Sequence, residues 1–93
     1  MKTKYLLILD CRSTIGSIYL NGNNDGTVTD GKLNHPLLDC TEIKMNNPYY
    51  IFAIRSLKKE GASHQSVYLP HGSVVAIYQY AEEQGYPPGF SCT

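Results

Sequence analysis

Two runs of β-forming residues, separated by a tight corner, constrain this chain more than any other feature. The runs lie at 65–69 and 74–80 and are rich in Val, Ile and Tyr. Between them, Pro70-His71-Gly72 combines a fixed φ angle with a flexible glycine, which is typical of a tight turn. We therefore predict two consecutive β-strands at 66–69 and 74–80. Such a pair is the usual ending of a small closed β-barrel.

The size of the chain limits the core that it forms. A single domain of 93 residues buries only about two-thirds of the surface of its unfolded chain, which favours self-association. Eight Lys and Arg residues balance eight Asp and Glu residues. The whole molecule therefore has no net charge to attract nucleic acid or an anionic membrane from a distance. Binding of nucleic acid or of a membrane must therefore use a local surface and not the charge of the whole molecule.

The amino-terminal residues resemble a secretion signal only superficially. The apolar run 5–9 follows Met1-Lys2-Thr3-Lys4 but stops at Asp10, and no small-residue cleavage site follows it. The run is shorter than an ordinary secretory core and far shorter than a membrane span. We interpret residues 4–11 as a buried strand. The expected protein is soluble and cytoplasmic, with no insertion into a membrane.

Residues 14–40 carry weaker signals. Residues 14–20 are predicted to form a second strand, bent at Gly16 where a residue without Cβ is needed. Residues 21–30 are rich in Asn, Gly, Asp and Thr, which predicts a loop. Residues 32–40 are interpreted as loop plus a short helix that begins near Pro36.

The second half of the chain is richer in strand signals. Residues 42–45 and 49–54 form one bent strand or two, interrupted at Asn46-Asn47-Pro48. Residues 55–63 are predicted to be a mobile basic connection, and Pro and Gly in 81–93 predict an irregular tail. The expected organisation is a single domain, 1–93, with its core at about 4–80.

About five to six short strands and one long polar loop predict a mainly β fold, an SH3-like small barrel with a strongly bent antiparallel sheet. Leu7-Ile8-Leu9-Asp10 through Thr14-Ile15-Gly16-Ser17-Ile18 resembles the opening of the Sm-like (LSm) family. Residues 65–75 are similar to the second motif of that family. They resemble most the bacterial RNA-chaperone branch, in which Val-Tyr and a His precede a Ser-containing apolar strand. The chain also resembles divergent Sm-like proteins of phage and metagenomic origin.

The resemblance implies a homo-oligomeric ring. In that family the fourth strand of one barrel pairs with the fifth strand of the next, which here places 66–69 against 74–80. Both segments are apolar strand edges that aggregate when they are left unpaired. The residues expected at the subunit interface are Val67, Tyr68, Leu69, Val75, Ile77, Tyr78 and Tyr80. Tyr78 and Tyr80 share one strand face and Ile77 lies on the other.

The same resemblance implies binding of single-stranded RNA near the corner, with His71 as the contact and Pro70 and Gly72 shaping the turn. A histidine ring stacks on bases or bonds their edges. Asn23 and Asn24 are candidate hydrogen-bonding partners from the other loop. The alternative is that His71 is a solvated turn residue and that the asparagines only form a turn. Arg55, Lys58 and Lys59 are candidates for phosphate contacts or a solvated loop.

A protein scaffold without RNA binding is the alternative function, with the loop 21–41 and the aromatic strand face of Tyr78 and Tyr80 as its binding surface. The neutral charge favours this alternative. Catalysis is not expected: Cys11 or Cys40 with His35, His64 or His71 is a conceivable Cys–His pair, but no nucleophile motif surrounds either cysteine. The wide spacing of Cys11, Cys40 and Cys92 gives no zinc pattern. We therefore expect no catalytic residue, metal or cofactor.

Overall fold

A computed structural model describes residues 2–56, 64–87 and 90–92. The described chain is mainly β, with one α-helix. Its elements in chain order are β1 (Thr3–Leu9), α1 (Thr14–Leu20), β2 (Gly26–Asp30), β3 (Leu33–Lys44), β4 (Tyr50–Ser56), β5 (His64–Pro70), the 3-10 helix η1 (His71–Ser73), β6 (Val74–Ala81), the 3-10 helix η2 (Glu82–Gln84) and β7 (Ser91–Cys92). No described helix has the length and apolar character needed to span a bilayer.

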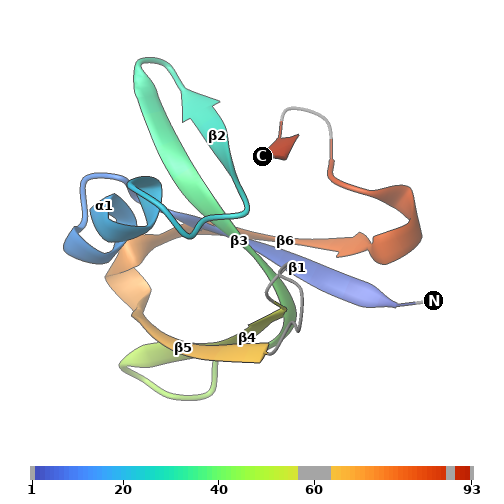
Figure 1. Cartoon of the computed structure of the whole chain (residues 1–93). Helices are drawn as coiled ribbons and strands as arrows, with labels where there is room; N and C mark the ends of the chain where they lie inside the picture. Colours follow the sequence, from blue (N-terminus) through green and yellow to red (C-terminus); the bar gives the residue numbers. More distant parts are fainter. Residues whose placement is uncertain (1, 57–63, 88–89, 93) are drawn as a thin grey trace.

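All pairings among the described strands are antiparallel, in the order β5-β4-β3-β1-β6, and β2 pairs with both β3 and β7. The mainly β, antiparallel prediction is therefore confirmed. Figure 1 shows the sheet curling so that β4 and β5 lie opposite β1 and β6, with α1 at one end. In the described residues no ladder joins β5 to β6, so the sheet is not closed into a barrel.

The strand β3 is the centre of the sheet because it changes partner along its length. Its first residues pair with β2, its middle with β1 and its last residues, from Cys40 onward, with β4. The pairing with β4 contains a register shift between Cys40 and Glu42. Pro36, which cannot donate a ladder hydrogen bond, is at the change from β2 to β1, where it is buried. The predicted loop and helix at 32–40 are therefore wrong, and 42–45 is the end of this one strand.

The segment 14–20 is a helix, and the predicted strand there is wrong. Ser13 caps the helix: its Oγ accepts a hydrogen bond from the Gly16 amide at 3.0 Å and donates to the Asp10 carbonyl at 2.7 Å. A Cβ on Gly16 would lie 1.8 Å from that carbonyl oxygen. The absence of Cβ therefore matters here, but for close approach of backbone rather than for a bent strand. Ile15 and Tyr19, four residues apart, pack on the core.

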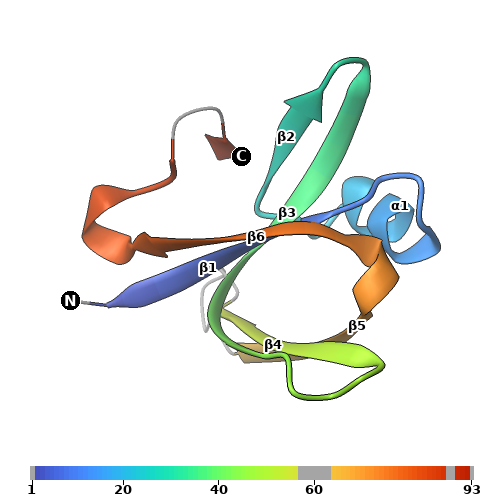
Figure 2. The ribbon, with the colours of Figure 1, turned by 180° about the vertical axis from the view of Figure 1, so that it is seen from behind.

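The Asn-rich loop is shorter than predicted, because β2 begins at Gly26. Asn23 has φ of 66°, the left-handed conformation that asparagine tolerates. The turn between β2 and β3 follows Asp30 and contains Gly31 with φ of 61°. Asp-Gly is a strong hairpin signal, and it could have indicated this turn from the sequence. In Figures 1 and 2 the β2–β3 hairpin extends away from the curled sheet.

The other strand predictions hold. Residues 4–11, 49–54, 66–69 and 74–80 correspond to β1, β4, β5 and β6. The tail is only partly irregular, since η2 lies within it and β7 pairs with the start of β2.

The core has two parts, one on each face of the sheet. The larger part lies inside the curl and consists of Leu7, Leu9, Leu38, Cys40, Ile51, Ala53, Val67 and Leu69. The smaller part, on the other face, contains Leu6, Ile8 and Leu37, with Tyr80, Tyr86 and Phe90 packed against it. The carboxyl-terminal segment therefore covers the outer face of β1. As predicted, Ile77 and Tyr80 lie on opposite faces of β6.

Candidate functional site

The predicted RNA contact His71 lies in η1, at the corner between β5 and β6, and its side chain is exposed. Its Nε2 atom forms a 2.8 Å hydrogen bond with the carbonyl oxygen of Asn47, in the loop between β3 and β4. Pro70 precedes the corner, and a Cβ on Gly72 would meet nothing within 4 Å. The histidine therefore links two loops at one end of the sheet, on an accessible surface.

The two asparagines predicted beside His71 have hydrogen bonds elsewhere. The Asn24 amide donates to the carbonyl oxygen of Tyr19 at 2.8 Å, and its Oδ1 accepts from the Gly26 amide at 3.1 Å. The carbonyl oxygen of Asn23 accepts a 2.7 Å hydrogen bond from Arg55. These bonds fix the connection between α1 and β2, to which Asn24 contributes its side chain and Asn23 its backbone carbonyl.

The predicted interface residues divide by exposure. The side chains of Val67 and Leu69 are buried in the core, and Ile77 packs against it. The side chains of Tyr68, Val75 and Tyr78 are exposed. Tyr80 is partly buried, and its hydroxyl donates a 2.8 Å hydrogen bond to Asp39. Only the outward members of the set are therefore available to another molecule through their side chains.

An aromatic surface lies on the outward face of the β4–β5 hairpin. Phe52 and Tyr68 are direct cross-strand partners with ring centroids 5.0 Å apart. Tyr50 lies two residues before Phe52 on the same face, and its side chain is also exposed. We call Tyr50, Phe52 and Tyr68 the aromatic face. Apolar bodies with polar tips are typical of binding surfaces.

The predicted basic connection is wrong at its first residue. Arg55 lies on β4 with 1% of its surface exposed, and its Nη2 is 2.9 Å from Oδ2 of Asp25. Its guanidinium also lies 5.7 Å from the centre of the Tyr19 ring. Arg55 is therefore not accessible to phosphate. Lys58 and Lys59 lie outside the described residues.

Arg55 and Asp25 form one buried polar group, and Asp39 is the centre of a second. Lys4 lies 3.0 Å from its Oδ2, and the hydroxyls of Tyr80 and Tyr86 donate to it at 2.8 and 3.3 Å. Burial, together with the hydrogen bond to Asp39, raises the pKa of Tyr80 above its ordinary value. Asp25 connects both groups, because its Oδ2 also accepts a hydrogen bond from the Asp39 amide. These partners are far apart in sequence, so no local motif indicated them.

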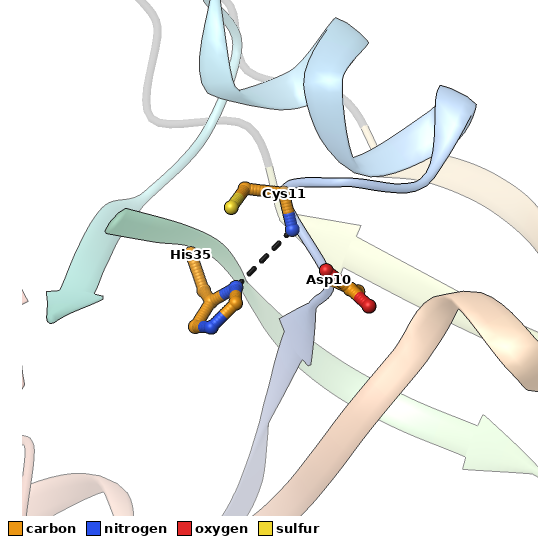
Figure 3. A group of neighbouring side chains, drawn as sticks. All are labelled: Asp10, Cys11 and His35. Atoms are coloured by element: carbon orange, nitrogen blue, oxygen red, sulfur yellow. Dashed lines mark hydrogen bonds between the residues drawn. The ribbon is translucent and has the colours of Figure 1, made fainter. Parts of the chain in front are cut away.

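A third polar cluster combines Asp10, Cys11 and His35 (Figure 3). One potential ligand atom from each residue lies within 4.8 Å of the others. The Cys11 backbone amide donates a 3.1 Å hydrogen bond to Nδ1 of His35. Cys11 and His35 form one of the Cys–His pairs that were conceivable from the sequence, and the fold brings them together. Cys40 instead lies in the core, where burial raises its pKa to about 12.

The three residues of this cluster differ in burial and in hydrogen-bond partners. His35 is buried with 4% of its surface exposed, whereas Asp10 and Cys11 are partly exposed. Because His35 Nδ1 accepts a hydrogen bond, the neutral ring carries its proton on Nε2, which lies 3.9 Å from Oδ2 of Asp30. Hydrogen bonds from Arg12 lower the pKa of Asp10 and keep it ionised.

No protein-family model, curated protein or solved structure matches this chain.

Proposed function

We propose that this chain is a non-enzymatic, Sm-like binding protein of the SH3-like barrel type, and that copies associate by pairing β5 of one with β6 of the next. The observation that carries this proposal is the position of β5 and β6 at the two ends of the strand path, each paired on one side only within the described residues. Unpaired strand edges accept another strand readily.

The composition of both edges supports the same proposal. Neither β5, HQSVYLP, nor β6, VVAIYQYA, contains a lysine, arginine or carboxylate. Proteins that stay monomeric commonly protect such edges with charged side chains or bulges. Tyr68, Val75 and Tyr78 are instead exposed along them. Because β5 and β6 are different surfaces, the contact is heterologous, and it generates a ring when its rotation closes.

Solution mass tests the association. Light scattering across a range of concentrations should give a defined mass that is a multiple of the chain mass. Val75→Lys places a charge on the β6 edge and should lower the mass, because a lysine there opposes strand addition. Ile18→Lys is the matched control, since Ile18 is 59% exposed on α1 and belongs to neither strand. A wild-type monomer at all concentrations, or equal masses for the two variants, would refute the proposal.

Single-stranded RNA is the second candidate, as a ligand of the assembled protein. The aromatic face supports it, because the exposed rings of Tyr50 and Tyr68 are able to stack on bases without a large net charge. His71 presents a further ring at the corner. The competing candidate is a protein scaffold that uses the same aromatic face for a protein partner.

A titration with polyuridine and polyadenosine at two salt concentrations separates these candidates. RNA binding should weaken as salt rises, since phosphate contacts release counterions. Tyr68→Ala and His71→Ala should each weaken it, whereas Ile18→Ala should not. Retained affinity in His71→Ala would remove the corner from the site. An oligomer that binds neither polymer would favour the scaffold.

A further inference from the structure

The cluster at the end of β1 brings together three different kinds of metal ligand. Asp10 and Cys11 directly follow β1, and His35 lies on β3, beside the point where that strand passes from β2 to β1. Figure 3 shows the three residues as neighbours from these two segments, with the Cys11 backbone amide directed at the His35 ring. The separation of 24 residues between Cys11 and His35 conceals this grouping in the sequence.

We propose that Asp10, Cys11 and His35 bind a divalent transition metal of the zinc class, with water in the fourth position. A thiolate, an imidazole and a carboxylate are all ligands of Zn²⁺. Their mixture of soft and hard donors disfavours Ca²⁺ and Mg²⁺, which take oxygen ligands. Three protein ligands leave one coordination position open. The inference does not depend on self-association or on RNA binding.

The placement of the two ring nitrogens of His35 suits this role. A metal takes the lone pair of a neutral imidazole nitrogen, and the other nitrogen keeps its proton. In His35, Nδ1 accepts its hydrogen bond from the Cys11 backbone amide, and Nε2 lies 3.9 Å from Oδ2 of Asp30. A shorter contact to the exposed Asp30 side chain would give the carboxylate–histidine arrangement that is common behind ligating histidines. Burial of His35 limits its motion further.

Binding requires a small contraction of the cluster. Tetrahedral ligands at zinc distances lie about 3.3–3.8 Å from one another, whereas the ligand atoms here lie within 4.8 Å. The side chains of Asp10 and Cys11 are partly exposed, so they are able to move and the metal has a path from solvent. The metal replaces the Cys11 amide at Nδ1 and displaces the thiol proton of Cys11 to water.

Arg12 competes with the metal for Asp10. Its Nε and Nη2 atoms donate to the two carboxylate oxygens at 3.0 and 3.3 Å, and the Arg12 side chain is otherwise exposed. These bonds occupy both carboxylate oxygens and place a positive charge nearby. Removal of the guanidinium should therefore strengthen metal binding, an effect that a purely structural cluster would not produce.

Cobalt and zinc titrations of the reduced full chain test the site. Co²⁺ should bind at one equivalent per chain and give thiolate-to-cobalt charge-transfer absorption, and Zn²⁺ should displace it. Zn²⁺ should also raise the melting temperature, because a ligand that binds the native state stabilises it. Cys11→Ser should abolish the charge-transfer band. Cys92→Ser is the matched control, and it should retain both the band and the thermal shift.

Further variants assign the other ligands. His35→Gln should lose the thermal shift produced by Zn²⁺, with His64→Gln as its control, and circular dichroism should first establish that each variant is folded. If His35→Gln is unfolded, Arg12→Ala carries the test, and it should bind Zn²⁺ more tightly than the wild type. A Cys11→Ser protein that retains the cobalt band would overturn the proposal. Unchanged or weaker affinity in Arg12→Ala would remove Asp10 from the site.

Discussion

Arg55 on β4 and Asp25, just before β2, form a 2.9 Å ion pair inside the protein. Their exposed fractions are 1% and 8%, so both charges have left water almost completely. Asp25 also accepts a hydrogen bond from the Asp39 amide on β3. The pair therefore links the segment between α1 and β2 to β3 and β4, two strands at the centre of the sheet. Each buried charge is compensated by the opposite charge of its partner.

Removal of one charge of this pair should destabilise the fold strongly. Asp25→Ala leaves the Arg55 guanidinium buried without its carboxylate, at a cost of about 3–5 kcal/mol. Urea unfolding followed by circular dichroism measures the change. Glu42→Ala is the control, because Glu42 and Lys44 form an exposed pair at 3.9 Å, whose loss costs about 1 kcal/mol or less. Equal effects of the two variants would contradict a structural role for the buried pair.

Gly16→Ala should destabilise the protein because its new Cβ would lie 1.8 Å from the Asp10 carbonyl oxygen. Relief of that overlap requires movement of α1 or of the chain after β1, at a cost of about 1–3 kcal/mol or more. Gly22→Ala is the matched control, since a Cβ there meets nothing within 4 Å. The difference in unfolding free energy between the variants is the test. A Gly16→Ala protein as stable as Gly22→Ala would contradict the close approach of α1 to the Asp10 backbone.

Tyr80→Phe should lower stability by about 1.5 kcal/mol at neutral pH, because it removes a hydrogen bond to the buried Asp39 carboxyl group. Burial and that hydrogen bond raise the pKa of Tyr80 in the folded protein above its ordinary value of 10.0. The stabilisation is thus complete below pH 10.0 and decreases above it, as the tyrosine of the unfolded chain releases its proton first. The cost of Tyr80→Phe should therefore shrink above about pH 10.

Urea unfolding at neutral and alkaline pH measures this dependence. Tyr68→Phe provides the control, since its side chain is 66% exposed on the aromatic face, and the change should alter stability by no more than about 0.5 kcal/mol. A Tyr80→Phe cost that grows as the pH rises would contradict the raised pKa of Tyr80 in the folded protein.

The two cysteines with described side chains should differ in reactivity. Cys40 is fully buried, and burial raises its pKa to about 12, so the native protein presents almost no thiolate there at neutral pH. Cys11 is partly exposed. Iodoacetamide should alkylate Cys11 much faster than Cys40 in the native protein, as measured by peptide mass spectrometry. The difference should vanish in urea, and comparable native rates would contradict the burial of Cys40.

Strand prediction succeeded where the signal was local. The segments 4–11, 49–54, 66–69 and 74–80 are runs of β-branched, aromatic or aliphatic residues with clear interruptions, and they became β1, β4, β5 and β6. Such runs suit a pleated, half-buried surface in almost any context. The grouping of Tyr50, Phe52 and Tyr68 on one face was not predicted, because it depends on the register of β4 against β5.

Prediction failed where a local pattern suited two structures. The segment 14–20 contains residues that form strands, but the Ser13 cap and the contact of Gly16 with the Asp10 backbone select a helix. Pro36 suggested a helical turn, but it lies at the point of β3 where the partner strand changes from β2 to β1. In both cases contacts with another segment decided the outcome.

The sequence by itself determined the mainly β character and the apolar composition of β5 and β6, because side-chain periodicity and β propensity are properties of neighbouring residues. Only the tertiary structure decided which polar groups meet. Arg55 with Asp25, and His35 with Asp10 and Cys11, are joined by the pairing of β3 with its neighbours. Such contacts depend on topology, since a sheet brings together residues that the chain keeps far apart.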